Sequence, residues 1–265
     1  MWLTFDLDGV LIENPFMSGV FPEIAETIAR RFNHTVDCMM PKDQLHQEVF
    51  ARIKKEYQRR FSSDNPHTAY DWDEIVNQVA QDFSYPDKID VEELVIKYCK
   101  PPHIKAYDRA DDLLKKLKEV GWKIGVITNG YRRYQQPVLE ALDLMKYVDQ
   151  LITPQGVETI KPDPSIFDEI EGLKTDKWFH IGDTISHDIL GGNIGGAKTI
   201  LVYREMVGQL RDIPVSKRVK SDPGQDLIDQ ILGEEAKRYS HLCQNREECR
   251  PDYIIGNLDE ILEIV

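Results

Sequence analysis

The chain has 265 residues, of which 46 are Asp or Glu and 33 are Lys or Arg, so its formal net charge is −13 at pH 7. This length suits one large α/β domain, or a core with a smaller module. The acidic balance argues against a protein that binds a nucleic-acid backbone, because such a protein needs a basic face. Small phosphorylated ligands remain open, since a metal ion and one or two cations can reverse the field within a single cleft.

The cysteines and the hydropathy pattern indicate the cellular setting. Cys38, Cys99, Cys243 and Cys249 are too few and too scattered for a disulfide scaffold of this size. No basic-then-apolar signal segment opens the chain, and no run approaches the ~18 apolar residues of a membrane span. We therefore expect a cytoplasmic protein with neither a membrane nor a nucleic-acid partner. The sequence does not indicate an oligomeric state.

The first predicted element is a short apolar run, residues 1–5, which is rich in β-formers and predicts a strand buried on both faces. Asp6 and Asp8 follow where this strand should end, just before Gly9. Residues two apart in a strand point the same way, so both acids are expected at the carboxyl end, where open α/β sheets bind ligands. Two close anions repel unless a cation lies between them, so the pair indicates a metal and nucleophilic chemistry. Taken alone, the motif also fits an ordinary turn.

Residues 14–100 show helix-like amphipathic segments and no convincing buried strand. The segments are 24–32, 45–61, 72–83 and 91–98. Prolines lie at both ends of this stretch, as is typical of linkers. We expect residues 14–100 to form a helical cap domain that is inserted after the first strand and lies above the carboxyl end of the sheet.

Beyond residue 100, short apolar runs alternate with amphipathic segments. The runs predict strands at 124–127, 178–181, 199–203 and 253–255, and the segments predict helices at 108–120 and 136–144. This alternation predicts an α/β fold with a Rossmann-like, doubly wound parallel sheet. The catalytic core would comprise residues 1–13 and 101–265. Within it, residues 205–250 form a highly charged insertion with one helix near 227–232, whose function the sequence does not indicate.

Two further polar motifs follow the predicted strands. Thr128, Asn129 and Gly130 come after 124–127, where a hydroxyl and backbone N–H groups would suit a phosphate oxygen, although the motif also fits a plain Asn-Gly turn. Lys161 stands in a proline-rich segment that ends at Pro164, which is expected to start a helix. In this position the positive charge of Lys161 could interact with a phosphoryl group and with nearby carboxylates. The alternative is that Lys161 is an ordinary solvated lysine.

A second pair of acids follows the strand predicted at 178–181. Asp183 comes at the strand end, and Asp188 lies five residues further on, near the start of the next helical segment. A helix N-cap with an acid in its first turn would explain one of the two. It would not explain why acids recur at the ends of strands.

The order of these motifs resembles the haloacid dehalogenase superfamily, which is named for one branch but consists mostly of phosphatases. The motifs are Asp6-Leu7-Asp8-Gly9, Thr128-Asn129-Gly130, Lys161-Pro162, and Gly182-Asp183-Thr184 with Asp188. The resemblance covers roughly residues 1–13 and 101–204, together with the end from Pro251. The inserted helices match the family's habit of placing a cap after the first motif.

The resemblance implies a set of catalytic roles. Asp6 would be the nucleophile that forms an aspartyl phosphate, and Asp8 would protonate the leaving oxygen and then activate water. Thr128 and the amides of Asn129 and Gly130 would hold phosphoryl oxygens, and Lys161 would offset the charge of the transition state.

The resemblance also implies Mg²⁺ as the cofactor, because a few carboxylates, a carbonyl and water suit this hard ion. Its ligands would be Asp6, the backbone carbonyl of Asp8, and Asp183, with Asp188 supporting directly or through water.

These roles imply a Mg²⁺-dependent phosphatase acting on a small phosphorylated metabolite, with nucleotidase and sugar-phosphate phosphatase branches as candidates. An aspartate at position 8 argues against a dehalogenase, since that branch needs no acid for a phosphate ester's leaving group. A sugar-phosphate phosphomutase remains open, because it uses the same acids. A non-catalytic protein that senses a phosphoester also remains open.

Overall fold

The computed structural model describes all residues except 36–40, 174–176, 207 and 240–244, so Cys38 and Cys243 lie outside the described residues. Its core is a six-stranded sheet with the order β5-β4-β1-β6-β7-β8. The strands are β1 (Trp2–Phe5), β4 (Lys123–Ile127), β5 (Gln150–Ile152), β6 (Trp178–Gly182), β7 (Lys198–Val202) and β8 (Tyr253–Ile255). Every neighbouring pair is parallel.

Helices cover both faces of this sheet. Consecutive strand residues point to opposite faces, and they belong to different apolar clusters: Leu3 and Phe5 pack in one, and Trp2 packs in another with Phe167 and Trp178. The helical elements of the core are α5 (Ala110–Glu119), α6 (Arg132–Ala141), η3 (Met145–Tyr147), α7 (Pro154–Val157), α8 (Ser165–Asp168), η5 (Ile185–Ile189), α9 (Leu190–Gly195) and η6 (Leu258–Glu263). The predicted Rossmann-like, doubly wound α/β core is therefore confirmed.

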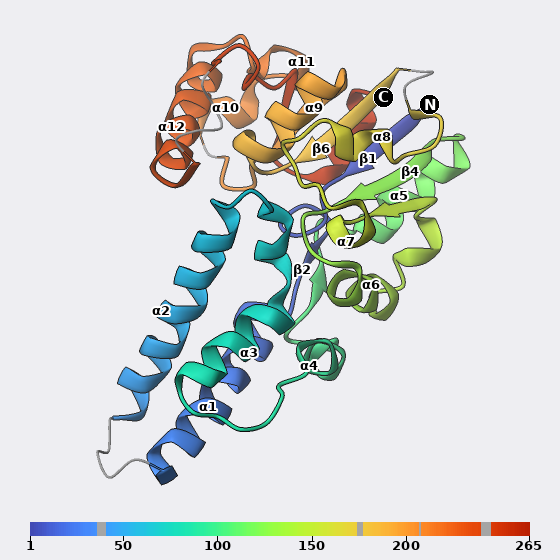
Figure 1. Cartoon of the computed structure of the whole chain (residues 1–265). Coiled ribbons are helices and arrows are strands. Elements are labelled where there is room, and N and C mark those ends of the chain that lie inside the picture. Colours follow the sequence, from blue (N-terminus) through green and yellow to red (C-terminus); the bar gives the residue numbers. More distant parts are fainter. Residues whose placement is uncertain (36–40, 174–176, 207, 240–244) are drawn as a thin grey trace.

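Between residues 14 and 100 the described chain is helical. It contains η1 (Phe16–Val20), α1 (Phe21–Thr35), α2 (Lys42–Phe61), η2 (Pro66–Tyr70), α3 (Trp72–Asp82) and α4 (Val91–Tyr98). We call α1 to α4 the cap helices; in Figure 1 they form a layer beside the sheet rather than on either of its faces. Where the chain leaves and re-enters the core, β2 (Ile12–Glu13) and β3 (Lys105–Ala106) form a small antiparallel pair that the sequence did not predict.

The described residues of the charged insertion form three helices, α10 (Gln209–Asp212), α11 (Val215–Arg218) and α12 (Asp222–Tyr239). Apolar residues of α12, among them Ile228, Ile231 and Leu232, form a separate cluster with Ile185 and Ile189 of η5. The insertion thus packs directly on the turn that follows β6.

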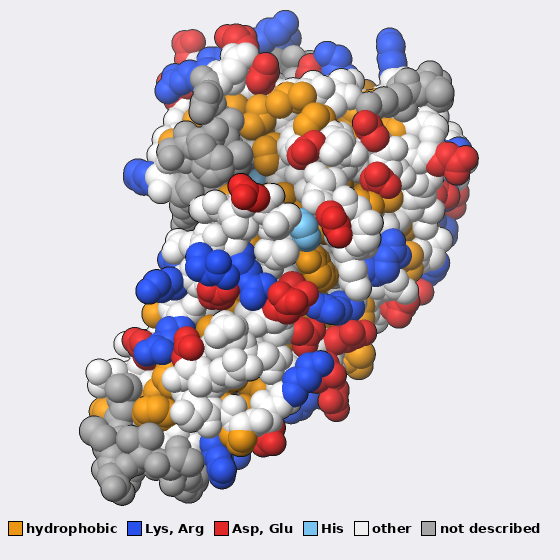
Figure 2. Space-filling view, viewed as in Figure 1, with side chains coloured by type: hydrophobic (Ala, Val, Ile, Leu, Met, Phe, Trp, Pro, Cys, Tyr) orange, Lys and Arg blue, Asp and Glu red, His pale blue; other side chains and the backbone are white. Residues whose placement is uncertain are grey.

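The surface carries both signs of charge. On the face shown in Figure 2, Lys and Arg side chains are interspersed with Asp and Glu, including where the cap helices meet the core. In the described part of the chain, no helix combines the length and the apolar character needed to cross a membrane.

Candidate active site

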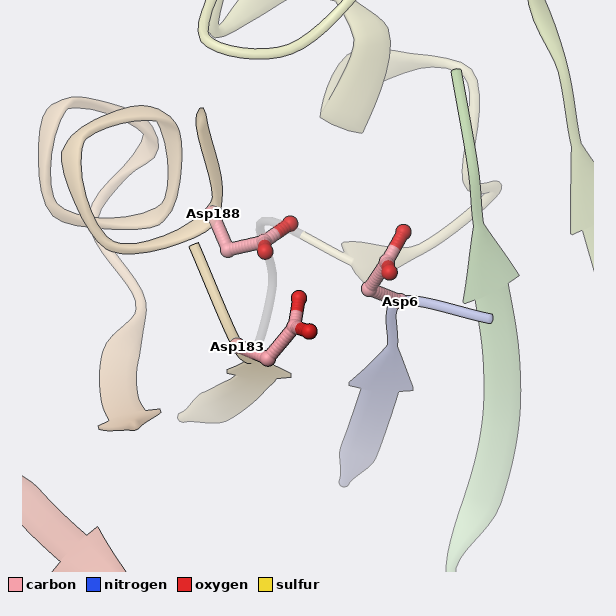
Figure 3. Close-up of side chains that lie close together, drawn as sticks. All are labelled: Asp6, Asp183 and Asp188. Atoms are coloured by element: carbon pink, nitrogen blue, oxygen red, sulfur yellow. The ribbon is translucent and has the colours of Figure 1, made fainter. Parts of the chain in front are cut away.

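Three carboxylates meet at the carboxyl ends of two neighbouring strands. Asp6 directly follows β1, Asp183 directly follows β6, and Asp188 lies in η5. One carboxylate oxygen from each lies within 4.8 Å of the other two, and Figure 3 shows the three side chains around a common space. Hard oxygen ligands in this arrangement could hold a divalent cation such as Mg²⁺.

Lys161 places its charge among these acids. Its side chain is only 2% exposed, and its Nζ donates to Asp188 Oδ1 at 2.6 Å and to Asp6 Oδ1. Burial opposes the charge on this lysine, but Asp188 and Asp6 outweigh burial and raise its pKa. Lys161 therefore remains protonated and offsets part of the repulsion between the carboxylates.

The same surroundings act unequally on two of the acids. Burial raises the pKa of Asp6 well above its ordinary value; Lys161 opposes this rise, whereas Asp188 and Asp183 add to it. Burial also opposes ionisation of Asp188, but Lys161 and His180 together have a larger effect and hold the pKa of Asp188 below its usual range. A cation bound between the carboxylates would favour the ionised form of Asp6.

Asp8 lies in a different environment from the three clustered acids. Its Oδ1 accepts from Asn14 Nδ2 at 2.7 Å, and its Oδ2 accepts from Gln135 Nε2 at 2.6 Å. Burial raises the pKa of Asp8, and the two amide donors oppose this rise only in part. The carboxyl group is thus held by neutral donors, and burial leaves its pKa above the ordinary value.

Gly9 is required by the backbone and by a close contact. Its φ is +81°, which L side chains rarely adopt, and an added Cβ would lie 2.2 Å from Asp183 Oδ2. The glycine of the first motif therefore lets the Asp8 turn approach the acid that follows β6.

The Thr128–Gly130 motif and Lys161 are joined by direct contacts. Asn129 Oδ1 accepts from the Lys161 N–H at 2.8 Å, and Asn129 Nδ2 donates to the Lys161 carbonyl at 3.2 Å. Thr128 is buried, and its Oγ1 accepts from the Gly130 N–H at 3.1 Å. The Asn129 side chain thus holds the backbone of the lysine, and the Gly130 N–H points at Thr128 here.

His180 is a buried residue of the site that sequence reasoning missed. It lies on β6, with Nδ1 2.9 Å from Thr4 Oγ1 and Nε2 3.4 Å from Asp188 Oδ1. Burial lowers its pKa. Strand alternation places it on the same face as Gly182, which is the only local signal that could have pointed to it.

The charged insertion also reaches the site. Both carboxylate oxygens of Glu235 on α12 accept backbone N–H groups of η5, from Ile185 at 2.9 Å and from Ser186 at 2.6 Å. These residues lie between Asp183 and Asp188. The insertion therefore anchors the turn that carries two of the three clustered acids.

Replacing Glu235 with alanine is expected to destabilise the protein. The two N–H groups would lose their acceptor in a partly buried place, at a cost of roughly 1–3 kcal/mol in the free energy of unfolding. Urea unfolding of Glu235→Ala and Glu234→Ala measures this, because Glu234 is an exposed neighbour on the same helix. Equal unfolding midpoints for the two variants would show that the Glu235 contacts contribute nothing.

A chamber of about 750 Å³ connects these groups with the cap helices. On the core side it is lined by Asp6, Asp8, Thr128, Asn129, Gly130, Gln135, Lys161, Asp183, Thr184, His187 and Asp188. On the other side it is lined by Asn14, Phe16, Met17, Phe21, Phe50, Ile53, Lys54, Tyr57, Tyr70 and Trp72. All of the sequence-predicted site residues therefore line one cavity.

Contacts between α6 and α3 hold the cap helices to the core. Tyr134 donates its hydroxyl to Asp73 Oδ2 at 2.8 Å and accepts from the Asp73 N–H at 2.9 Å. Arg133 pairs with Asp71. Neither link could be predicted from the sequence, because the partners lie about sixty positions apart.

The amino-acid sequence is similar to those of known proteins. The chain is 26% identical over 214 residues to pyrophosphatase PpaX of Bacillus cereus (strain B4264), an alignment that covers 77% of this chain and 84% of the relative. It is 30% identical over 158 residues to PpaX of Halalkalibacterium halodurans, covering 56% of this chain and 72% of that one.

Solved structures share the fold. A HAD phosphatase from Thermococcus onnurineus matches with a TM-score of 0.60 and 23% identity, covering 78% of this chain and 89% of that chain. The L-2-haloacid dehalogenase of Xanthobacter autotrophicus matches with a TM-score of 0.55 and 14% identity, covering 100% and 98%. The sequence model of the haloacid dehalogenase-like hydrolase family matches residues 1–196, so the chain belongs to this family of hydrolases.

Proposed function

We propose that the protein is a Mg²⁺-dependent phosphatase that hydrolyses a small phosphorylated metabolite through an aspartyl phosphate on Asp6. The observation that supports this proposal is that two nearby acids have different surroundings. Asp6 lies beside Asp183, Asp188 and Lys161, whereas Asp8 is held apart by neutral amides. The names of the PpaX relatives support a phosphate-releasing activity.

In the first half of the reaction, a carboxylate oxygen of Asp6 attacks phosphorus. The bond from phosphorus to the leaving oxygen breaks as Asp8 donates its proton to that oxygen. In the second half, Asp8 takes a proton from a water molecule that attacks the phosphoryl group. The Asp6–phosphorus bond then breaks, which restores Asp6 and releases inorganic phosphate.

The remaining polar residues would bind the charged groups. The donor set fits Mg²⁺, which Asp6, Asp183, Asp188 and the Asp8 carbonyl would hold. When bound, Mg²⁺ would neutralise charge between Asp6 and the phosphoryl oxygens. Phosphoryl oxygens would be held by Thr128, Asn129 and Gly130, and Lys161 would offset the charge that develops on them. Residues 14–100 would act as the cap that closes over the leaving group, above a core of residues 1–13 and 101–265.

The proposed role of Asp8 predicts a dependence on the leaving group. Asp8→Asn should lower kcat/KM for an alkyl phosphate by roughly 10²–10⁴, the usual contribution of a general acid. Acetyl phosphate should suffer a much smaller loss, because acetate leaves without a proton. Equal losses for benzyl phosphate and acetyl phosphate would contradict a role for Asp8 in protonating the leaving group.

The function is tested by measuring phosphate release from a panel of phosphorylated metabolites and pyrophosphate, with Mg²⁺ and with a chelator. We expect release that requires Mg²⁺ and disappears in Asp6→Asn. Isomerisation of a sugar phosphate without free phosphate would identify a phosphomutase instead. Binding of an ester with no turnover in the parent protein would identify a phosphoester sensor.

A further inference from the structure

The chamber above the acids has walls of two kinds. Its core side presents the carboxylates, the lysine and the amides that the proposed mechanism uses, whereas its other side is mostly apolar and aromatic. Whatever is attached to the phosphoryl group must occupy the second part. The chemistry of that part therefore reports on the leaving group.

The helix α2 supplies one apolar wall. Phe50, Ile53 and Tyr57 recur at spacings of three and four residues, which places them on one face of the helix, and all three line the chamber. Ile53 is only 4% exposed. The other apolar wall is formed by residues of η1, the start of α1 and the start of α3, namely Phe16, Met17, Phe21 and Trp72.

The aromatic side chains of this wall pack against one another. The rings of Tyr57 and Trp72 are stacked, with centroids 5.7 Å apart and an interplanar angle of 13°. Trp72 also contacts Phe16 at 5.7 Å and Phe21 at 5.1 Å between centroids. Rings that support each other in this way form a preorganised apolar surface, which costs little conformational entropy to use.

Polar groups on this side are scarce and mutually engaged. The hydroxyl of Tyr57 donates to that of Tyr70 at 3.3 Å, and Asn14 is used by Asp8 and by the Phe16 N–H. Of the described lining residues contributed by positions 14–100, Lys54 alone is charged. The hydroxyl groups of a sugar would be poorly paired here, at a considerable desolvation cost, and a second phosphate would meet Lys54 as the single cation among the described residues of this wall.

We propose that the chamber selects phosphate monoesters whose leaving group is flat and apolar, an aryl or arylalkyl alcohol, over sugar phosphates and pyrophosphate. The inference rests on the proposed phosphatase function and assigns it a substrate class. In this respect the chain would differ from its relatives named pyrophosphatase. The volume of about 750 Å³ is that of a typical small-molecule site and accommodates one ring beside the phosphoryl group.

The test compares benzyl phosphate, glucose 6-phosphate and pyrophosphate with the full chain and Mg²⁺. Benzyl alcohol and the sugar are both primary alcohols that Asp8 would protonate on leaving, so a rate difference between these two reports on binding of the leaving group rather than on its reactivity. We expect kcat/KM for benzyl phosphate to exceed that for either other substrate by at least about tenfold, since burial of one ring suffices for this. Calorimetry on Asp6→Asn should show tighter binding of benzyl phosphate, with a negative heat-capacity change.

A matched pair of variants locates the selectivity. Phe50 lines the chamber, whereas Phe32 of α1 is half-buried against Phe83, at 5.6 Å between ring centroids, and does not line it. Phe50→Ala should lower the preference for benzyl phosphate over glucose 6-phosphate about fivefold to tenfold. Phe32→Ala, which also removes a half-buried ring from the cap helices, should leave this preference in place. Equal effects of the two variants would contradict the assignment.

The outcomes separate the two proposals. If glucose 6-phosphate or pyrophosphate equals or exceeds benzyl phosphate, and release still requires Asp6, the selectivity is overturned and the phosphatase function stands. If no ester releases phosphate but benzyl phosphate still binds preferentially, the phosphatase function is overturned and the selectivity stands. Absence of both turnover and preferential binding would overturn both.

Discussion

Asp6→Asn is expected to abolish turnover while leaving the fold intact. The amide cannot form the aspartyl phosphate, so steady-state phosphate release should fall by on the order of 10⁴-fold or more, as for the loss of other catalytic nucleophiles. The fold should persist because Lys161 retains its contact with Asp188, and because removal of one charge relieves repulsion among three acids. Steady-state kinetics and thermal unfolding together measure both parts of this prediction.

The control for this variant is binding of the substrate. A correctly folded Asp6→Asn protein should still bind the phosphate ester, so calorimetry distinguishes lost chemistry from lost structure. Retention of more than a few per cent of the parent activity, in protein free of deamidated material, would contradict the nucleophile assignment.

Lys161→Met is expected to cost both activity and stability. Without the ammonium group, Asp6 and Asp188 face each other and Asp183 with no internal cation. Removing one partner of a buried ion pair typically costs roughly 3–5 kcal/mol, so we expect a loss of this size in the free energy of unfolding at neutral pH without Mg²⁺. Urea unfolding measures it, with Lys54→Met, which changes an exposed lysine of the same chamber, as the control.

The pH dependence of this loss has a definite sign. In Lys161→Met the folded-state pKa values of Asp6 and Asp188 should both lie above those in the parent protein, because the cation that lowers them is gone. The folded protein then binds more protons than the unfolded chain, so its stability recovers as pH falls. A loss that is the same at neutral and mildly acidic pH would show that lost packing, rather than charge, causes it. Added Mg²⁺ should also restore part of the stability.

Much of the site could be predicted because it is organised by the ends of strands. Phe5 of β1 pairs in register with Val126 of β4 and with Ile181 of β6. Polar residues that follow these strands must therefore lie near one another, and Asp6, Thr128 and Asp183 do so. Each apolar run followed by polar residues also fits a turn when taken alone, but their recurrence at several strand ends indicates such a site.

The supporting contacts could not be predicted in the same way. Gln135 holds Asp8 across 127 positions and Glu235 holds Ile185 across 50 positions. Each is one polar residue on an amphipathic helix, and nothing in its local sequence separates it from solvated neighbours. Such pairings are properties of the packed structure, and they become visible only when the helices are placed against the sheet.

Some elements were also missed or misjudged for physical reasons. The strand β5 has only three residues, Gln150–Ile152, so its apolar character does not stand out from a turn. The helix predicted to start at Pro164 is only the single turn Ser165–Asp168. The helix predicted at 136–144 begins earlier, at Arg132, and ends at Ala141, because helix ends depend on capping more than on apolar spacing.

The most direct test of the account is to trap the covalent intermediate. The full chain with Mg²⁺ is mixed rapidly with a turned-over phosphate ester, quenched in acid within the first turnover, digested, and examined by mass spectrometry. We predict a phosphoryl group on the peptide that contains Asp6, reducible by borohydride to homoserine at that position and absent in Asp6→Asn. A phosphoryl group on another residue, or none during rapid turnover, would contradict the central claim that Asp6 is the nucleophile.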